Sequence, residues 1–259
     1  MEPGTSPFSS QTEASCKVMT YALLFGPLLA DHLDFSGREE ICRELLPVVL
    51  RQHEIFRDYI DEKGVLHPAE KWWLFVDHEP RLCRETPAMG IYVYSLRRTA
   101  EMMQKLQIDG YAELLAEADR ISALLRERLW DGERKLMKSD NGQFSFATQA
   151  WMILAGVATA EQAKLMWQSL WSDPEILRPR TPYLWSTVME AGLAIGEEAK
   201  VREFIVEYWG GMVDRGADTF WEVYDPAEPL YSSYGDAMMN SACHAWSCFP
   251  GYLLRFGKI

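Results

Sequence analysis

The sequence predicts an all-α fold in which paired helices form a ring. Apolar residues recur at helical spacing along most of the 259 residues, and no convincing run of alternating polar and apolar residues indicates a strand. Short turns join the expected helices on one side, and long aromatic loops join them on the other. This alternation favours an (α/α) toroid with small, apolar inner helices and amphipathic outer ones. A plain helical bundle and a helical-repeat solenoid are the competing architectures, and the lack of a fixed repeat weakens the solenoid.

Capping and turn residues mark the expected helices along the chain. Ser36 or Gly37 can begin the second helix, and Pro47 either kinks that helix or marks its start. Thr159 begins a sequence that resembles a capping box, and Thr181 is a good N-cap because a proline follows it. The nine ranges expected to be helical are 14–33, 36–59, 86–106, 111–130, 144–156, 159–170, 181–195, 197–215 and 236–254.

The composition is that of one folded domain. With 48% hydrophobic and 12% aromatic residues, the chain can bury a substantial core. We expect a single domain over residues 1–259, beginning with an irregular segment, 1–13, that is rich in Pro, Gly, Ser and Thr. The 26 basic and 38 acidic residues give a net charge of -12, which disfavours nucleic acids and anionic membranes as partners. Neutral ligands such as sugars stay compatible with this charge.

The cysteines and the N-terminal sequence indicate a reducing compartment. Five cysteines without regular spacing predict reduced, mostly buried thiols and a cytoplasmic protein. The N-terminal sequence has no signal-peptide pattern, and the apolar run 21–30 is too short to span a bilayer. The sequence has no zinc-ligand spacing, phosphate-binding loop, dinucleotide fingerprint or serine-hydrolase elbow, so we expect no metal and no organic cofactor.

The strongest candidate for chemistry is Glu222, which precedes a turn-rich loop. It follows Trp221, whose indole offers a flat apolar face for a sugar ring, while the carboxylate can accept a proton from water or a hydroxyl. The alternative is that Trp221 caps a core and Glu222 is merely solvated. The pair indicates a carbohydrate site, with Glu222 as the catalytic residue and Trp221 as a substrate-binding one.

Four more residues are candidates for binding a sugar. Asp77 lies in the irregular, aromatic stretch 66–85, where burial raises a carboxyl pKa and hydrogen bonding lowers it. The alternative for Asp77 is a structural cap or a loop-closing hydrogen bond. His244 is expected on the last helix, where a lone His is more often a core residue. Trp73 and Trp185 can stack on a sugar ring, although packing in the core is the commoner role for any single Trp.

Several motifs together resemble the catalytic domains of bacterial α-L-rhamnosidases, chiefly their C-terminal half. In chain order these motifs are Phe-Val-Asp at 75–77, and the stretches 144–150, 181–183, 189–193, 208–212, 216–222 and 240–246. The matches span roughly residues 37–259. Their order and spacing are more specific than any one motif.

The resemblance implies an (α/α)6 toroid of the six-hairpin glycosidase type, and inverting hydrolysis of a terminal α-linked sugar. In that family the Glu of the motif at 216–222 is the general base, which maps to Glu222. The His of the last helix and the Asp of the Phe-x-Asp motif lie at the sugar, and these map to His244 and Asp77.

Two departures from the family pattern bear on activity. His78 stands where the family has a Trp. The family's general acid lies in a carboxylate-rich motif upstream of the Phe-x-Asp segment, and residues 1–36 contain nothing like it. Inverting hydrolysis needs two carboxyl groups roughly 6.5–9.5 Å apart. Glu79 and Glu13 are substitutes that lie outside the family's pattern.

About nine helices are expected, against twelve in a full toroid, so we expect an incomplete ring with exposed apolar flanks. A missing N-terminal part or oligomerisation would complete it. Three functions follow: a rhamnosidase-type glycoside hydrolase or the C-terminal part of one, a non-catalytic carbohydrate-binding remnant without the acid, and a helical protein-binding scaffold. Convergence of Glu222, Asp77 and His244 would separate the first two from the scaffold.

Overall fold

A computed structural model describes residues 17–257 of the chain. This part contains nine α-helices and four two-residue strands. In chain order the elements are β1 (Lys17–Val18), α1 (Met19–Ser36), α2 (Glu39–Arg57), β2 (Trp72–Trp73), α3 (Glu85–Lys105), α4 (Tyr111–Leu129), β3 (Trp130–Asp131), β4 (Leu136–Met137), α5 (Phe146–Leu154), α6 (Ala160–Ser172), α7 (Pro182–Ala194), α8 (Glu198–Asp214), the 3₁₀ turns η1 (Ala237–Met239) and η2 (Ala245–Ser247), and α9 (Phe249–Arg255). The prediction of an all-α fold is confirmed.

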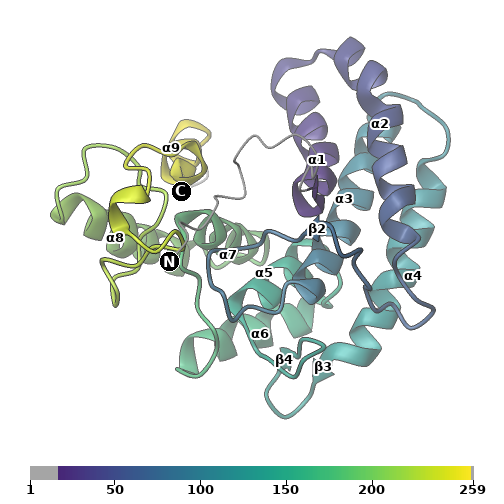
Figure 1. Cartoon of the computed structure of the whole chain (residues 1–259). Coiled ribbons are helices and arrows are strands. Elements are labelled where there is room, and N and C mark those ends of the chain that lie inside the picture. The colour runs from purple at the N-terminus through teal and green to yellow at the C-terminus, as the bar shows by residue number, and fades with distance from the viewer. Residues whose placement is uncertain (1–16, 258–259) are drawn as a thin grey trace.

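The helices are arranged as successive pairs along an arc. Helices α1, α3, α5 and α7 pack against one another in that order, and α2, α4, α6 and α8 each pack against the preceding helix. Figure 1 shows the pairs following one another from the purple α1–α2 pair to the green α7–α8 pair. The C-terminal helix α9 comes back to the first helix. Phe256, just after α9, packs on Phe35 of α1, with ring centroids 4.8 Å apart. Four pairs and α9, within the described residues, form the incomplete all-α toroid that the sequence predicts.

Burial separates inner helices from outer ones, as the sequence analysis expects. Helix α5 buries every residue except Leu154, so it faces other helices on all sides. Helix α2 buries only a stripe with alternating spacings of four and three residues, namely Cys42, Leu46, Val49, His53 and Phe56. Its remaining face is exposed and mainly charged, although Ile41 and Val48 are also on it. The candidate site residues lie on the loops that lead into the inner helices α3 and α7 and on the loop that follows α8.

The capping residues of α6 and α7 are confirmed, whereas the predicted start of α2 is wrong. Thr159 and Gln162 form a complete capping box, and the Thr181 hydroxyl accepts a hydrogen bond from the backbone N–H of Leu184. Helix α2 instead begins after Arg38, whose side chain does not cap it, and Pro47 lies inside the helix.

The helix predicted over 236–254 is wrong. This segment forms η1, η2 and α9, with irregular chain between them. The backbone N–H groups of Ser241 and His244 bond to the Glu222 carboxylate and to the Phe220 carbonyl, at 2.8 and 2.7 Å. Because these donors have partners elsewhere, they do not form helical hydrogen bonds. His244 therefore lies on a loop just before η2, and not on a helix as predicted.

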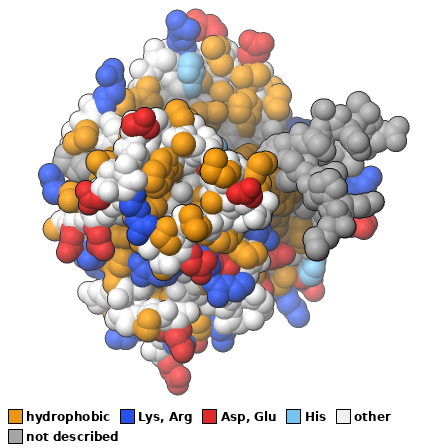
Figure 2. Space-filling model, turned by 60° about the vertical axis from the view of Figure 1, so that its left-hand side comes forward, with side chains coloured by type: hydrophobic (Ala, Val, Ile, Leu, Met, Phe, Trp, Pro, Cys, Tyr) orange, Lys and Arg blue, Asp and Glu red, His pale blue; other side chains and the backbone are white. Residues whose placement is uncertain are grey.

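Large hydrophobic side chains remain exposed around α8 and the C-terminal loops. The most exposed are Met238 and Leu230, at 89% and 83%, followed by Val206 and Leu254, each at 70%. Figure 2, which brings the left-hand side of Figure 1 forward, shows hydrophobic side chains spread among acidic and basic ones on this face. These side chains are dispersed over the surface, and the expected apolar flank of the incomplete ring stays a prediction. Within residues 17–257, no helix is long and apolar enough to cross a membrane.

The cysteine prediction holds only in part. All four cysteines among the described residues are free thiols. Cys42 and Cys83 are buried, whereas Cys243 and Cys248 are exposed. Cys16 lies outside the described residues. The expectation of mostly buried thiols is wrong for the C-terminal pair, because the predicted helix that would have buried them is a set of loops.

Candidate active site

The loop that carries Asp77 is fixed to the first inner helix. The Thr20 hydroxyl on α1 donates to the backbone carbonyl of Phe75 (2.7 Å) and accepts from the Phe75 N–H (3.1 Å). Strand β2, just before this loop, also pairs with β1 in parallel register. A wholly buried threonine thus satisfies both backbone groups of Phe75, and the next few residues are held over the inner helices.

Asp77 is tied to the N-terminus of α7. Its two carboxylate oxygens accept from the Thr181 hydroxyl (2.6 Å) and from the backbone N–H of Arg180 (2.7 Å). Burial raises the pKa of Asp77 to about 6, although these hydrogen bonds oppose the shift. Asp77 therefore changes its protonation state near neutral pH. The loop-closing hydrogen bond anticipated as an alternative is present, and the carboxyl still borders the pocket described below.

Glu222 is held in place by donors on both carboxylate oxygens. The Tyr234 hydroxyl donates to Oε1 (2.7 Å), and the Ser241 N–H donates to Oε2 (2.8 Å). The Glu222 backbone carbonyl also accepts from the indole N–H of Trp246 (3.0 Å). Only 6% of the Glu222 surface is exposed, so these bonds fix one rotamer of a nearly dry carboxylate.

The surroundings keep Glu222 ionised. Burial by itself would raise the pKa of this carboxyl, but the hydrogen bonds from Ser241 and Tyr234, together with His244 and His78 nearby, lower it below its ordinary value. The negative charge acts on its neighbours, because it contributes to raising the pKa of Tyr21 to about 12, after burial. Glu222 therefore has the protonation state of a base.

His78 faces Glu222 across a short gap. Its Nε2 lies 3.5 Å from Glu222 Oε1, and both side chains are less than a tenth exposed. Its other ring nitrogen, Nδ1, lies 2.7 Å from the Ser233 hydroxyl. Burial lowers the pKa of His78 despite the nearby carboxylate, so the imidazole is neutral at neutral pH. Within residues 17–257, Nε2 is buried and has no hydrogen-bond partner, so Glu222 Oε1 is the polar atom it faces.

A pocket of about 460 Å³ lies beside these residues. Its lining combines an aromatic wall with polar groups, and includes Trp73, Phe75, Asp77, His78, Arg84 and Tyr234. Glu222 does not line the pocket itself. Its carboxylate lies behind His78 and Tyr234, two lining residues that both contact it. The volume suits a small ligand such as one sugar ring, and the aromatic faces suit its apolar side.

The structure brings together four of the six predicted site residues. Asp77 and Trp73 line the pocket. His244 stacks on Trp246 with ring centroids 4.1 Å apart, and its charge affects the pKa of Glu222. Asp77 and Trp73 thus line the pocket, whereas Glu222 and His244 lie next to it without lining it.

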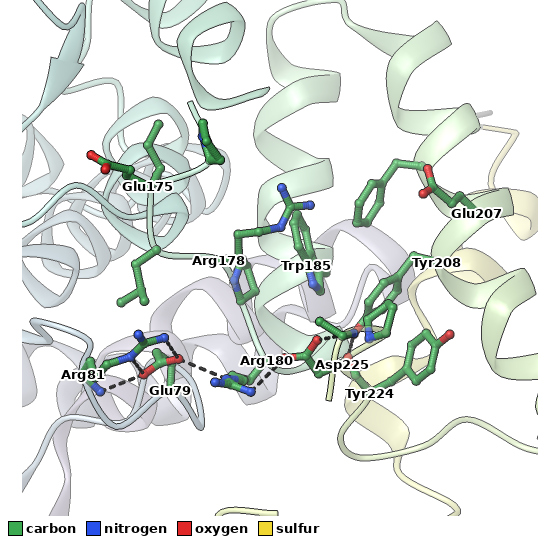
Figure 3. A pocket seen from close by; sticks show the side chains of 17 residues that line it. Glu79, Arg81, Glu175, Arg178, Arg180, Trp185, Glu207, Tyr208, Tyr224 and Asp225 are labelled. Atoms are coloured by element: carbon green, nitrogen blue, oxygen red, sulfur yellow. Dashed lines mark hydrogen bonds and ion pairs between the residues drawn. The ribbon is translucent and has the colours of Figure 1, made fainter. Parts of the chain in front are cut away.

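The other two predicted residues lie elsewhere. The Trp221 ring packs on Tyr224, with centroids 6.0 Å apart. Trp185 is 3% exposed, and it belongs to a different pocket, shown in Figure 3. Tyr234, which the sequence analysis does not single out, holds Glu222 directly. It lies in an irregular loop where no spacing or motif indicates it.

Glu79, one of the two substitutes for the general acid, is engaged in ion pairs. Its oxygens accept from Arg81 Nε (2.8 Å) and Arg180 Nε (3.0 Å). Burial would raise its pKa, but these two guanidinium groups hold the pKa at about 2. A carboxylate with this pKa does not donate a proton at neutral pH. The second substitute, Glu13, lies outside the described residues.

Two solved rhamnosidase structures are similar to this chain. The chain is similar to a rhamnosidase from Klebsiella oxytoca with rhamnose bound, with a TM-score of 0.89 and 32% identity over 94% of this chain and 48% of that one. The resemblance to rhamnosidases is confirmed. A GH78 family rhamnosidase from Bacillus sp. GL1 has the same fold, with a TM-score of 0.82 and 24% identity over 93% of this chain and 26% of that chain. No protein-family model matches the chain, and no curated protein matches it either.

The rhamnosidase-like chain spans about half the length of the Klebsiella rhamnosidase. Over the part of the two rhamnosidases that it matches, the chain has a glycoside hydrolase fold. Within residues 17–257, no cluster of three or more His, Cys, Asp or Glu side chains is placed to hold a metal ion.

Proposed function

We propose that the chain forms the sugar-binding part of a rhamnosidase-type glycoside hydrolase, with Glu222 as the general base. The observation that carries this proposal is the state of Glu222. It is buried, ionised and fixed by Tyr234 and Ser241 beside an aromatic pocket. A base of this kind takes a proton from a water molecule as that water attacks the sugar. The similarity to a rhamnosidase structure that holds rhamnose supports α-linked L-rhamnose, or a closely similar sugar, as the ligand.

The other residues of the pocket would recognise and orient the sugar. Asp77 and His78 offer polar atoms for sugar hydroxyls, and Trp73 offers a ring for the apolar face. His244, fixed by its stacking on Trp246, lies close enough to Glu222 for their charges to interact. Inverting hydrolysis also needs a proton donor across the glycosidic bond. Glu79 does not fill that role because two arginines hold it ionised.

The engaged state of Glu79 favours a second candidate function, a carbohydrate-binding remnant without hydrolysis. Both candidates use the same pocket and differ only in the acid. For hydrolysis, the proton donor would have to come from a group other than Glu79, such as Glu13, a further part of a longer protein or a second copy of this chain. We also infer a cytoplasmic location and a single domain over residues 1–259, on the cysteine pattern and the continuous helical pairing.

The test is hydrolysis of an aryl α-L-rhamnoside, measured beside calorimetric binding of L-rhamnose. We expect Glu222→Gln to reduce hydrolysis by at least about 100-fold, since a positioned base contributes on that order, without a comparable loss of binding. Glu44→Gln, which makes the same change at an exposed position on α2, is the matched control. Binding without hydrolysis in the unmodified chain would select the remnant. The absence of both would refute the sugar site.

A further inference from the structure

A second pocket lies on the other side of the segment that carries Asp77. It has a volume of about 620 Å³ and is floored by aromatic side chains of α7 and α8, among them Trp185, Phe204 and Tyr208. Figure 3 shows Trp185 and Tyr208, with Arg178 beside Trp185 and with Arg180 between Glu79 and Asp225. Residues 79, 81 and 180 line this pocket, whereas residues 77, 78 and 80 line the first. The two pockets are therefore neighbours that share one wall.

The charged groups of this wall are already paired. Arg180 contacts Glu79 (3.0 Å), Asp225 (2.8 Å) and Glu228 (2.7 Å), and Arg81 contacts Glu79 (2.8 Å). Charges held in such a network have few hydrogen-bonding positions left for a ligand. The binding capacity of the pocket must therefore come from its other polar groups.

Arg178 is the cation of this pocket that has no such partner. Among the residues that the structure describes, none forms a hydrogen bond or an ion pair with its guanidinium group. The group lies over the rings of Trp185 and Phe146, at 5.1 and 5.2 Å from their centroids. Partial burial lowers the pKa of Arg178, yet an arginine stays charged at neutral pH. The planar guanidinium of Arg178 therefore lines the pocket with no hydrogen-bonded acceptor among the described residues, while the charges of Asp225 and Glu207 act on it from nearby.

We propose that this pocket is a second ligand site, which binds a ring compound carrying one carboxylate. The guanidinium of Arg178 receives the carboxylate, and the rings of Phe204 and Tyr208 receive the ligand's ring. A cation is disfavoured because Arg178 already occupies the faces of Trp185 and Phe146. A doubly charged phosphate is disfavoured because Glu175 and Glu207 also line the pocket and no further unpaired cation balances them among the described residues. An acidic sugar fits both requirements.

The experiment compares two ligands that differ only in the carboxylate. Methyl α-D-glucuronide and methyl α-D-glucoside are titrated by calorimetry into the full chain. We expect the glucuronide to bind at least about tenfold more tightly, because a charge-assisted hydrogen bond contributes that much or more. Arg178→Gln should remove this advantage, and Arg178→Lys, which keeps the charge but not the planar fork, should retain part of it.

Arg202→Gln is the matched control, since Arg202 is an exposed arginine on α8 that does not line the pocket. Equal affinity for the two ligands would overturn the proposal, as would an unchanged affinity in Arg178→Gln or an equal loss in Arg202→Gln. Saturating L-rhamnose should leave glucuronide binding unchanged. Displacement by rhamnose would place the glucuronide in the Glu222 pocket and refute the second site. The Arg178 comparison stays decisive even if the chain binds no rhamnose.

Discussion

The bond between Thr181 and Asp77 is expected to stabilise the fold and the site together. Thr181 caps α7 by accepting from the Leu184 N–H at 3.2 Å, and it also donates to Asp77 at 2.6 Å. Thr159 caps α6 at the same 3.2 Å distance, and no carboxylate among residues 17–257 accepts a hydrogen bond from its hydroxyl. Replacing each threonine by valine keeps its shape and removes its hydroxyl. The difference between the two variants therefore reports the bond to Asp77.

The magnitudes follow from these contacts. Loss of an N-cap costs about 1 kcal/mol, which is the whole effect expected for Thr159→Val. Thr181→Val also removes one of the hydrogen bonds to the Asp77 carboxylate, and a hydrogen bond to a charged group contributes about 1.5–3 kcal/mol. The sum is about 2.5–4 kcal/mol for Thr181→Val. In a chain of this size, each 1 kcal/mol lowers Tm by about 2–4 °C, so we expect losses of roughly 2–4 °C for Thr159→Val and 5–16 °C for Thr181→Val.

Calorimetric melting of both variants at about pH 5 and about pH 8 is the assay. The Thr181 hydroxyl lowers the pKa of Asp77, so its removal raises that pKa above about 6 and makes the ionised form less stable. The extra loss in Thr181→Val should therefore be larger at the higher pH. Equal Tm losses for the two variants, or a difference that does not grow with pH, would refute the reasoning.

Two further predictions concern Asp77 and the packing of α7. Because burial raises the pKa of Asp77 to about 6, above its ordinary 3.8, the folded protein binds more protons than the unfolded chain between those values, and stability falls by up to about 3 kcal/mol as pH rises through that window. Asp77→Asn should lack this pH-dependent component. Its Tm should therefore fall less than that of the unmodified protein between about pH 4.5 and about pH 7. Parallel curves of Tm against pH for the two proteins would contradict the prediction. Gly192→Ala on α7 would place its Cβ 2.6 Å from the Trp167 ring, a clash that costs about 1–3 kcal/mol, whereas Gly210→Ala on α8 meets no atom within 4 Å and should gain about 0.5–1 kcal/mol. Thermal melting checks the pair, and a Gly192→Ala protein as stable as Gly210→Ala would show that the α6–α7 contact is not tight.

The helices are the part of the fold that local sequence determines. The capping box at Thr159 and the N-cap at Thr181 predict the starts of α6 and α7 because their side chains bond within one turn. The stripe on α2 likewise follows from the helical period. Inner and outer helices are distinguishable because a helix surrounded by other helices has no polar face.

The site is predicted only where a motif or an unusual neighbour marks a residue. Glu222, Asp77, His244 and Trp73 are proposed in this way; Asp77 and Trp73 line one pocket, and His244 lies near Glu222 beside it. Tyr234 is missed because a tyrosine in an irregular loop has no local signal.

Tertiary contacts decided what the sequence period could not. The segment 236–254 has helical spacing, yet Ser241 and His244 give their N–H groups to Glu222 and Phe220, which lie about twenty residues earlier. Tertiary packing also turned Trp185 toward the second pocket and Trp221 toward Tyr224, and it paired Glu79 with two arginines. A hydrogen bond or an ion pair between distant segments depends on where the whole ring places its loops. The sequence alone determined most of the helices and singled out Glu222 as the candidate carboxylate, whereas only the folded ring decided which side chains surround that carboxylate.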